Sequence, residues 1–209
     1  MQVIDPRMRA YYERRAREYD HWWLGSDSFR GVARPSWSQE VRKLIAVVEA
    51  LSPARVLDVA CGTGFLTRHL RGTVTALDQS ETMVEIARSR LPEATVLRGE
   101  AVPLPFGDGA FDRVFTGHFY GHLLPDEREA FLREARRVAP ELVVVDSALR
   151  EDREPEEWQE RLLSDGSRYR VYKRYFGPET LCAELGGAEI LHAGRWFVVA
   201  ATGGRDRIS

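Results

Sequence analysis

A nine-residue run, VLDVACGTG at residues 56–64, joins an apolar strand to a glycine turn. Because its apolar residues are nearly continuous, the run predicts a strand that is buried on both faces of a parallel sheet. Gly62 and Gly64 lack a Cβ, so a ligand can approach the backbone of the turn. Asp78 ends the next apolar run and can accept hydrogen bonds from both hydroxyls of a ribose. Together these residues predict a site for a nucleoside cofactor.

The residues around the turn separate this site from two common phosphate-binding turns. A dinucleotide site has a third glycine where this chain has Thr67. A Walker A loop has G-K-[ST], which does not follow Gly62. Asp58, at the end of the strand, would repel a phosphate and attract an ammonium group. We therefore expect a cationic nucleoside rather than a dinucleotide.

Short apolar segments alternate with helical segments from residue 55 onward, which is typical of a parallel sheet with helices on both faces. The expected strands are 55–60, 73–77, 95–98, 112–116 and 141–146. The expected helices are 6–23, 38–51, 64–70, 80–90 and 126–138. Ser80 is placed to cap the helix that follows it.

The last third of the chain predicts a different pattern. A charged connection after Ser147 leads into a short helix at 156–164, and the basic residues of RYRVYKRYF (168–176) fit the solvent side of a strand or loop. A helix at 178–185 precedes two β-like runs, 188–193 and 196–202, which form a hairpin. No second domain is expected in these 209 residues.

Three motifs in order carry a resemblance to a known family: VLDVACGTG, then VTALDQS (74–80), then GEAVPLPFGDGAFDRVF (99–115). In order and spacing they resemble the motifs of class I S-adenosylmethionine-dependent methyltransferases, of the small-molecule type 11/25-like domain, over about residues 40–150. The resemblance implies an α/β, Rossmann-like fold with a mainly parallel seven-stranded sheet and a C-terminal antiparallel hairpin. It also implies methyl transfer from S-adenosylmethionine to a small molecule by direct displacement.

The resemblance divides the single domain into four parts. These are an N-terminal lid helix and loop (1–36), a cofactor-binding core (37–147), an acceptor-side insertion (148–187) and the C-terminal hairpin (188–202). Arg30 or Arg34 in the lid could reach the cofactor carboxylate.

The same resemblance assigns the cofactor contacts. Asp58 lies near the ammonium group of the methionine moiety, Asp78 accepts from the ribose, and Glu100 accepts from the adenine amino group. Family members more often have Asp at the position of Glu100. The full set of expected cofactor residues is Asp58, Ala60, Gly62, Gly64, Asp78, Gln79, Met83, Glu100, Ala101 and Gly117.

Candidate acceptor residues follow strand 112–116 and lie on the first helix. His118, the candidate catalytic residue, or His122 could act as a general base, since a histidine pKa lies near working pH. Many enzymes of the resembled family need no base, however, and His122 stands where the family often has a structural histidine. Tyr12, Tyr19 and Tyr120 are expected to contact the acceptor. The aromatic and basic residues of 168–176 could form a wall of the acceptor pocket, and they would also suit RNA bases.

Composition limits the alternatives. A net charge of −2 argues against nucleic acid as an obligatory partner, although an RNA (tRNA) methyltransferase and a non-catalytic S-adenosylmethionine-binding protein stay open. No metal-ligand spacing or apolar membrane span is present, so we expect a cytoplasmic protein. The 30 basic residues include only two lysines, Lys43 and Lys173, and Asn is absent, which indicates a GC-rich, bacterial genome. The acceptor and the oligomeric state are not specified by the sequence.

Overall fold

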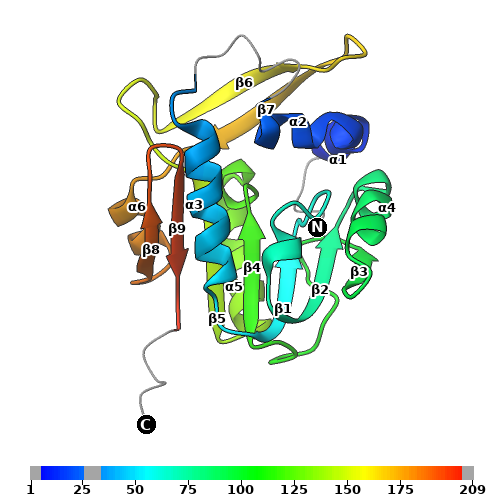
Figure 1. Ribbon diagram of the computed structural model, residues 1–209, viewed down its shortest axis with the longest axis vertical. Helices are drawn as coiled ribbons and strands as arrows, with labels where there is room; N and C mark the ends of the chain where they lie inside the picture. The colour runs from blue at the N-terminus through cyan, green and yellow to red at the C-terminus, as the bar shows by residue number, and fades with distance from the viewer. Residues whose placement is uncertain (1–5, 26–33, 204–209) are drawn as a thin grey trace.

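A seven-stranded sheet forms the centre of the computed structural model, which describes residues 6–25 and 34–203 (Figure 1). In spatial order its strands are β3 (Thr95–Arg98), β2 (Gly72–Asp78), β1 (Ala54–Val59), β4 (Arg113–Gly117), β5 (Glu141–Ser147), β9 (Phe197–Ala201) and β8 (Glu189–Ala193). The first five are parallel, and β9 is antiparallel to both β5 and β8. The predicted fold class is confirmed, including the C-terminal hairpin.

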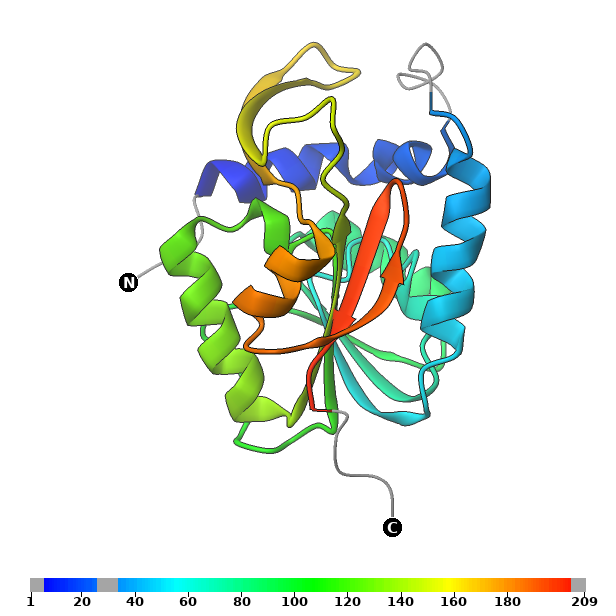
Figure 2. The ribbon, with the colours of Figure 1, turned by 90° about the vertical axis from the view of Figure 1, so that its left-hand side faces the viewer.

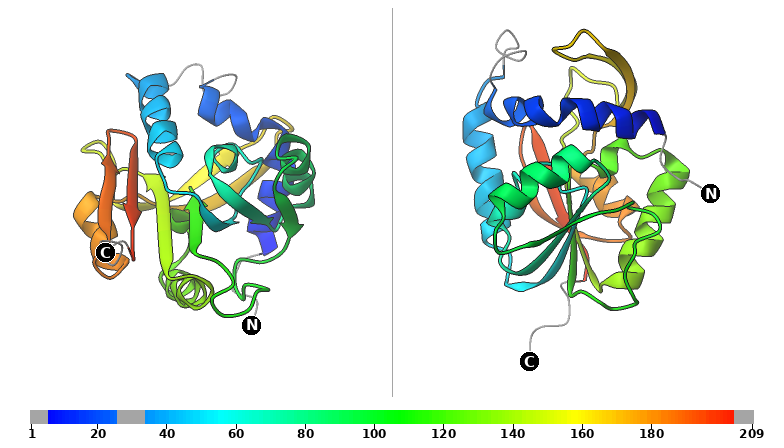
Figure 3. Two further views of the ribbon diagram at one scale, coloured as in Figure 1. Left: turned by 60° about the horizontal axis from the view of Figure 1, so that its bottom comes forward. Right: turned by 90° about the vertical axis from the view of Figure 1, so that its right-hand side faces the viewer.

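Helices cover both faces of this sheet (Figure 3). On one face Val56 packs in a cluster with α3 (Trp37–Glu49), and Ala76 packs with α4 (Glu81–Arg90). On the other, Leu57 packs with α5 (Pro125–Val138) and α6 (Pro178–Glu184). Successive strand residues therefore enter different cores, which is why the strands read as continuous apolar runs.

The carboxyl ends of the parallel strands are covered by two segments that are distant in sequence (Figures 1 and 2). One consists of α1 (Pro6–Arg15), a 3₁₀ turn (Ala16–Glu18) and α2 (Tyr19–Leu24); the other is a hairpin of β6 (Glu156–Leu162) and β7 (Arg168–Arg174). Ala16 and Trp23 of the N-terminal segment are buried. Within the described ranges, no helix has the length and apolar character needed to cross a bilayer.

The predicted helix at 156–164 is wrong, because these residues form β6. Their side chains alternate between exposed and half-buried, as expected for a strand, and they pair with β7 from Glu156–Arg174 to Leu162–Arg168. The many Glu and Arg residues favour a helix locally, so the partner strand decides the structure. Lys173 of β7 is also buried rather than on the solvent side.

The predicted helix at 64–70 is reduced to a turn and a short 3₁₀ helix, Thr67–His69. Gly64 has φ +80°, and a Cβ there would lie 2.8 Å from the side chain of Leu91. The Thr67 hydroxyl donates to Asp58 instead of facing solvent. The expected cap of α4 is present, since the Ser80 hydroxyl accepts from the backbone N–H of Met83.

A buried ion pair fastens the hairpin to the sheet. Lys173 Nζ lies 2.6 Å from Asp146 Oδ1, and the two residues are 4% and 0% exposed. Asp146 also accepts from the backbone N–H groups of Gly121 and Ser147, each at 2.7 Å. Burial alone would raise the pKa of Asp146, but the charge of Lys173 and its hydrogen bond hold that pKa below its ordinary value.

We expect Asp146→Asn to lower the free energy of unfolding by about 3–5 kcal/mol, because the substitution leaves the Lys173 ammonium buried without a counter-charge. Urea denaturation measures the change. Glu160→Gln, which removes a carboxylate from an exposed pair with Arg168, is the control and should change stability by less than about 0.5 kcal/mol. The double variant with Lys173→Met should recover part of the loss; equal losses in the single and double variants would contradict this account.

Candidate functional site

The ends of β1, β2 and β4 enclose a cavity of about 40 Å³, here called the strand-end cavity. Seven of the predicted cofactor residues line it: Ala60, Gly62, Asp78, Gln79, Met83, Ala101 and Gly117. Tyr12 and Tyr19 of the N-terminal segment close it from above, and His118 and Phe119 lie at its side. The three motifs therefore meet at one place in the fold.

Three predicted cofactor residues are placed differently. Asp58 lines an adjoining small recess that shares Tyr19, Ala60 and Gly117 with the strand-end cavity. Gly64 packs against Leu91 and lines neither space. Glu100 lies between two lining residues but does not itself line the cavity.

Asp78 is held by the backbone of the glycine turn. Its Oδ2 accepts from the N–H of Gly62 and its Oδ1 from the N–H of Ser80, both at 2.9 Å. Burial raises the pKa of Asp78 to about 6, against the effect of these bonds. Each carboxylate oxygen can accept a further hydrogen bond, so the group suits a ligand with two neighbouring hydroxyls.

Asp58 is buried with one oxygen unsatisfied. Its Oδ2 accepts from the Thr67 hydroxyl at 2.6 Å, whereas Oδ1 has no hydrogen-bond partner among the described residues. Burial raises the pKa of Asp58 to about 7, the Thr67 bond lowers it, and the charge of Asp78 raises it again. A cationic group in the recess would satisfy Oδ1 and stabilise the ionised form.

The backbone around the cavity adopts rarely populated conformations. Ala60 and His118 have φ values of 60° and 56°, in the left-handed region that residues with a Cβ seldom adopt. Gly62 has φ 56°, and a Cβ there would lie 3.4 Å from the ring of Tyr19. Such conformations persist where the surrounding structure fixes them and often occur at functional sites.

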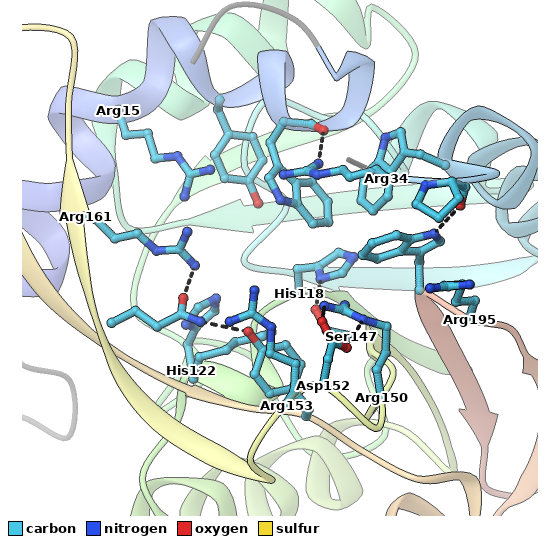
Figure 4. Close-up of a pocket in the computed structure, with 18 of the residues that line it drawn as sticks. Arg15, Arg34, His118, His122, Ser147, Arg150, Asp152, Arg153, Arg161 and Arg195 are labelled. Carbon is cyan, nitrogen blue, oxygen red and sulfur yellow. Dashed lines mark hydrogen bonds and ion pairs between the residues drawn. The ribbon is translucent and has the colours of Figure 1, made fainter. Parts of the chain in front are cut away.

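A second cavity, of about 260 Å³, lies between the N-terminal segment and the β6–β7 hairpin (Figure 4). We call it the arginine cavity, after Arg15, Arg34, Arg150, Arg153, Arg161 and Arg195, which line it together with Lys173. Tyr12, Tyr19 and His118 line both cavities, so the two spaces meet at these three residues.

Sequence reasoning missed this cluster, apart from naming Arg34. The arginines come from segments far apart in the chain, and the arginine bias of the composition hides them as individual residues. A sequence signal was present at Lys173, one of two lysines in a chain that otherwise uses arginine. Arg30 lies outside the described residues.

His118 is buried at the junction of the two cavities. Its Nδ1 lies 3.4 Å from the Ser147 hydroxyl and 3.9 Å from Asp146 Oδ1, and its Nε2 has no partner among the described residues. Burial lowers the pKa of His118 to about 3, against the charge of Asp146. The imidazole is therefore neutral and only weakly basic at physiological pH.

His122 and Tyr120 have roles in packing. His122 Nδ1 donates to the backbone carbonyl of Tyr172 at 2.7 Å, which fits the structural role expected for it. Tyr120 is 1% exposed, its ring stacks on Phe176, and its hydroxyl donates to Glu184. It lines neither cavity, which corrects its prediction as an acceptor residue: the side chain points into the core.

Comparison with known proteins supports the reading of the motifs. The profile of the methyltransferase domain family (Methyltransf_11) matches residues 57–141. The chain is 38% identical over 107 residues to a demethylmenaquinone methyltransferase of Thermotoga maritima, which covers 49% of this chain and 44% of that protein. A demethylmenaquinone methyltransferase of Listeria welshimeri is 36% identical over 113 residues, or 49% and 46% of the two chains. The chain thus spans less than half the length of these curated relatives.

Solved structures cover more of the molecule. The DhpI-SAM-HEP complex has a TM-score of 0.72 and 29% identity, and covers 96% of this chain and 97% of its own. The DhpI-SAH complex has a TM-score of 0.69 and 28% identity, with 94% and 96% coverage. Protein PH0226 of Pyrococcus horikoshii, at 19% identity and a TM-score of 0.61, shares the fold.

The raised pKa of Asp58 predicts a pH-dependent stability of the ligand-free protein. Because the folded state holds the proton more tightly than the unfolded chain, the free energy of unfolding falls as pH rises from about 4 to about 7. Asp58→Asn removes this loss, so its stability relative to the parent protein should be higher at pH 8 than at pH 5. Urea denaturation at both pH values measures the difference, and an equal difference at both would contradict it. Glu93→Gln, at an exposed position, is the control.

Proposed function

Because the chain belongs to the class I S-adenosylmethionine-dependent methyltransferases, we propose that it transfers the methyl group of S-adenosylmethionine to a small molecule. The observation that carries the proposal is the junction at Tyr12, Tyr19 and His118, where the strand-end cavity adjoins the arginine cavity. One space suits a nucleoside and the other suits an acceptor.

The residues of the strand-end cavity and its recess fit the cofactor. In our proposal Asp78 accepts from the ribose hydroxyls, and the unsatisfied Oδ1 of Asp58 receives the ammonium group. Gln79, Met83 and Ala101, which line the same cavity, would hold the adenine. When bound, the cofactor supplies a methyl group already activated by the sulfonium charge.

The protein then contributes mainly position. Tyr12 and Tyr19 line both cavities and would hold cofactor and acceptor next to each other, and Tyr19 packs over the glycine turn. A neutral His118 orients the acceptor rather than removing a proton. Holding the acceptor in line and excluding water can supply about 7–11 kcal/mol of the barrier.

We do not assign to this chain the acceptor of the demethylmenaquinone methyltransferases. Their similarity extends over about half of this chain. The cavity assigned to the acceptor is lined by residues of the described N-terminal segment, the insertion (148–187) and the hairpin turn at Arg195. Seven of its lining side chains are basic, a charge that a neutral quinone would not satisfy.

Cofactor binding is tested by calorimetric titration with S-adenosylhomocysteine. Asp78→Asn should weaken binding about 10- to 100-fold, because a hydrogen bond to a charged group is lost, whereas Glu93→Gln should bind as tightly as the parent. Protein that binds NAD but not S-adenosylhomocysteine would contradict the proposal. Release of S-adenosylhomocysteine with an acceptor panel separates an enzyme from a binding protein that does not turn over.

The low pKa of His118 predicts the pH profile of turnover. Because burial keeps the imidazole neutral above about pH 4, no rise in kcat/KM near pH 6.5 should arise from this residue. We expect His118→Gln to lower kcat/KM without changing the shape of the profile between pH 6 and 8.5. A limb near pH 6.5 that disappears in the variant would restore the general-base prediction.

A further inference from the structure

We propose that the methyl acceptor is a small molecule with an oxyacid group, bound in the arginine cavity, and that an oxygen of this group receives the methyl. The inference rests on the proposed function and names its substrate class. It covers phosphonates, phosphate monoesters and carboxylates, which share an anionic oxygen that guanidinium groups recognise.

The charge in the arginine cavity is strongly one-sided. Seven basic side chains line it and the single lining carboxylate is Asp152. Asp152 pairs with Arg150 at 2.9 Å, Glu157 pairs with Arg153 at 3.4 Å, and Asp146 pairs with Lys173. Within the ranges that the structure describes, no carboxylate pairs with Arg15, Arg161 or Arg195. An uncompensated cluster of like charges is costly unless an anion is bound among them.

The titration behaviour of Arg34 agrees with this imbalance. Burial lowers its pKa most, and the like charges of Arg161, Arg150 and Arg15 lower that pKa further. Arg161 belongs to β6, Arg150 to the loop after β5, and Arg15 to α1. In Figure 4 Arg15 of α1, Arg161 of β6, and Arg150 and Arg153 of the loop between β5 and β6 extend toward one central space.

Several guanidinium groups are held in place by aromatic rings. Arg34 lies 4.5 Å from the Trp37 ring, Arg150 lies 4.3 Å from the Trp196 ring, and Arg15 lies 5.1 Å from the Tyr19 ring. Stacking restrains the plane of a guanidinium and leaves N–H groups at its edge available to an oxyanion. The cavity is therefore organised before a ligand enters.

Arg161 has donor capacity that the protein does not use. Its Nη2 donates to the side chain of Gln159, but its Nε is buried and has no hydrogen-bond partner among the described residues. A buried N–H without a partner costs stability, so its retention in a cavity wall indicates a ligand acceptor.

Oxyanion methylation also matches the lack of a strong base at the junction. The attacking oxygen is already ionised at neutral pH, so no proton has to be removed and a neutral His118 is sufficient. An oxygen lone pair forms the new O–CH₃ bond while the C–S bond breaks and sulfur keeps its electron pair. The sulfonium becomes a neutral thioether and the acceptor loses one negative charge, so atoms and charge balance.

The cavity favours a small molecule over a phosphate in RNA. At about 260 Å³ it accommodates a compact ligand. RNA binding would also need a basic surface beyond the cavity, whereas the net charge of the chain is −2.

Binding to protein saturated with S-adenosylhomocysteine tests the inference. The probes are phenylphosphonate, phenyl phosphate, benzoate and the uncharged benzyl alcohol, titrated by calorimetry. We expect at least one anion to bind at least tenfold more tightly than the alcohol and to weaken with added salt. The three anionic probes show which oxyacid the cavity prefers. With S-adenosylmethionine, mass spectrometry should detect the methyl ester of the preferred anion.

Variants identify the cavity as the binding site. Arg161→Gln and Arg15→Gln should each weaken the anion about 10-fold or more, as expected for the loss of a charged hydrogen bond, and leave the Kd of S-adenosylhomocysteine unchanged. Arg168→Gln, on the same hairpin but exposed and outside the cavity, should bind the anion like the parent.

The outcomes separate the two proposals. Failure to bind S-adenosylhomocysteine would overturn the proposed function. If S-adenosylhomocysteine binds normally, two results would overturn the proposal of an oxyanion acceptor. One is that benzyl alcohol binds as tightly as the anions; the other is that Arg161→Gln and Arg168→Gln bind the anion with equal affinity. An RNA oligonucleotide is titrated as a further probe. The oxyanion proposal would also be overturned if this RNA bound in the cavity and none of the small anions did.

Discussion

The buried ion pair between Lys173 and Asp146 joins the cofactor half of the molecule to the cavity that faces it. Asp146 ends a central strand and lies 3.9 Å from His118 Nδ1, while Lys173 belongs to the hairpin that supplies Arg161. The same carboxylate accepts from the backbone of Gly121. Because one buried carboxylate bonds to both Lys173 and the Gly121 backbone and lies beside His118, the carboxyl edge of the sheet and the cavity wall keep fixed relative positions.

The two cavities bury charged groups of opposite sign, carboxylates in one and guanidinium groups in the other. Asp58 and Asp78 are buried carboxylates whose pKa values are raised, so the ligand-free strand-end cavity favours a cationic, hydroxyl-bearing partner. Across the junction, Arg15, Arg161 and Arg195 pair with no carboxylate in the part of the chain that the structure describes, and they favour an anion. A sulfonium donor and an oxyanion acceptor would be attracted to adjoining spaces of opposite preference, and their charges would decrease together during transfer.

Much of the fold and the cofactor side could be predicted from local patterns. Asp58, Gly62 and Asp78 lie within a few residues of a strand end, so the spacing alone places them at one sheet edge. The prediction of a helix at 156–164 was wrong, because the composition of this segment favours a helix and only its pairing with β7 makes it a strand. The prediction that Tyr120 contacts the acceptor was wrong, because the turn after β4 directs its side chain into the core. No periodicity in the sequence reveals this direction.

The sequence by itself determined the parallel sheet, the glycine turn and the acidic residues that we propose receive a cationic nucleoside, because each depends on neighbours close along the chain. Only the tertiary structure decided the acceptor side. Arg15, Arg161 and Arg195 are separated by up to 180 residues and carry no shared motif. These arginines form an anion-binding cluster only because the N-terminal helix, the hairpin and the last turn bring them around one cavity. The electrostatics of a site depends on distances in space rather than on distances in sequence.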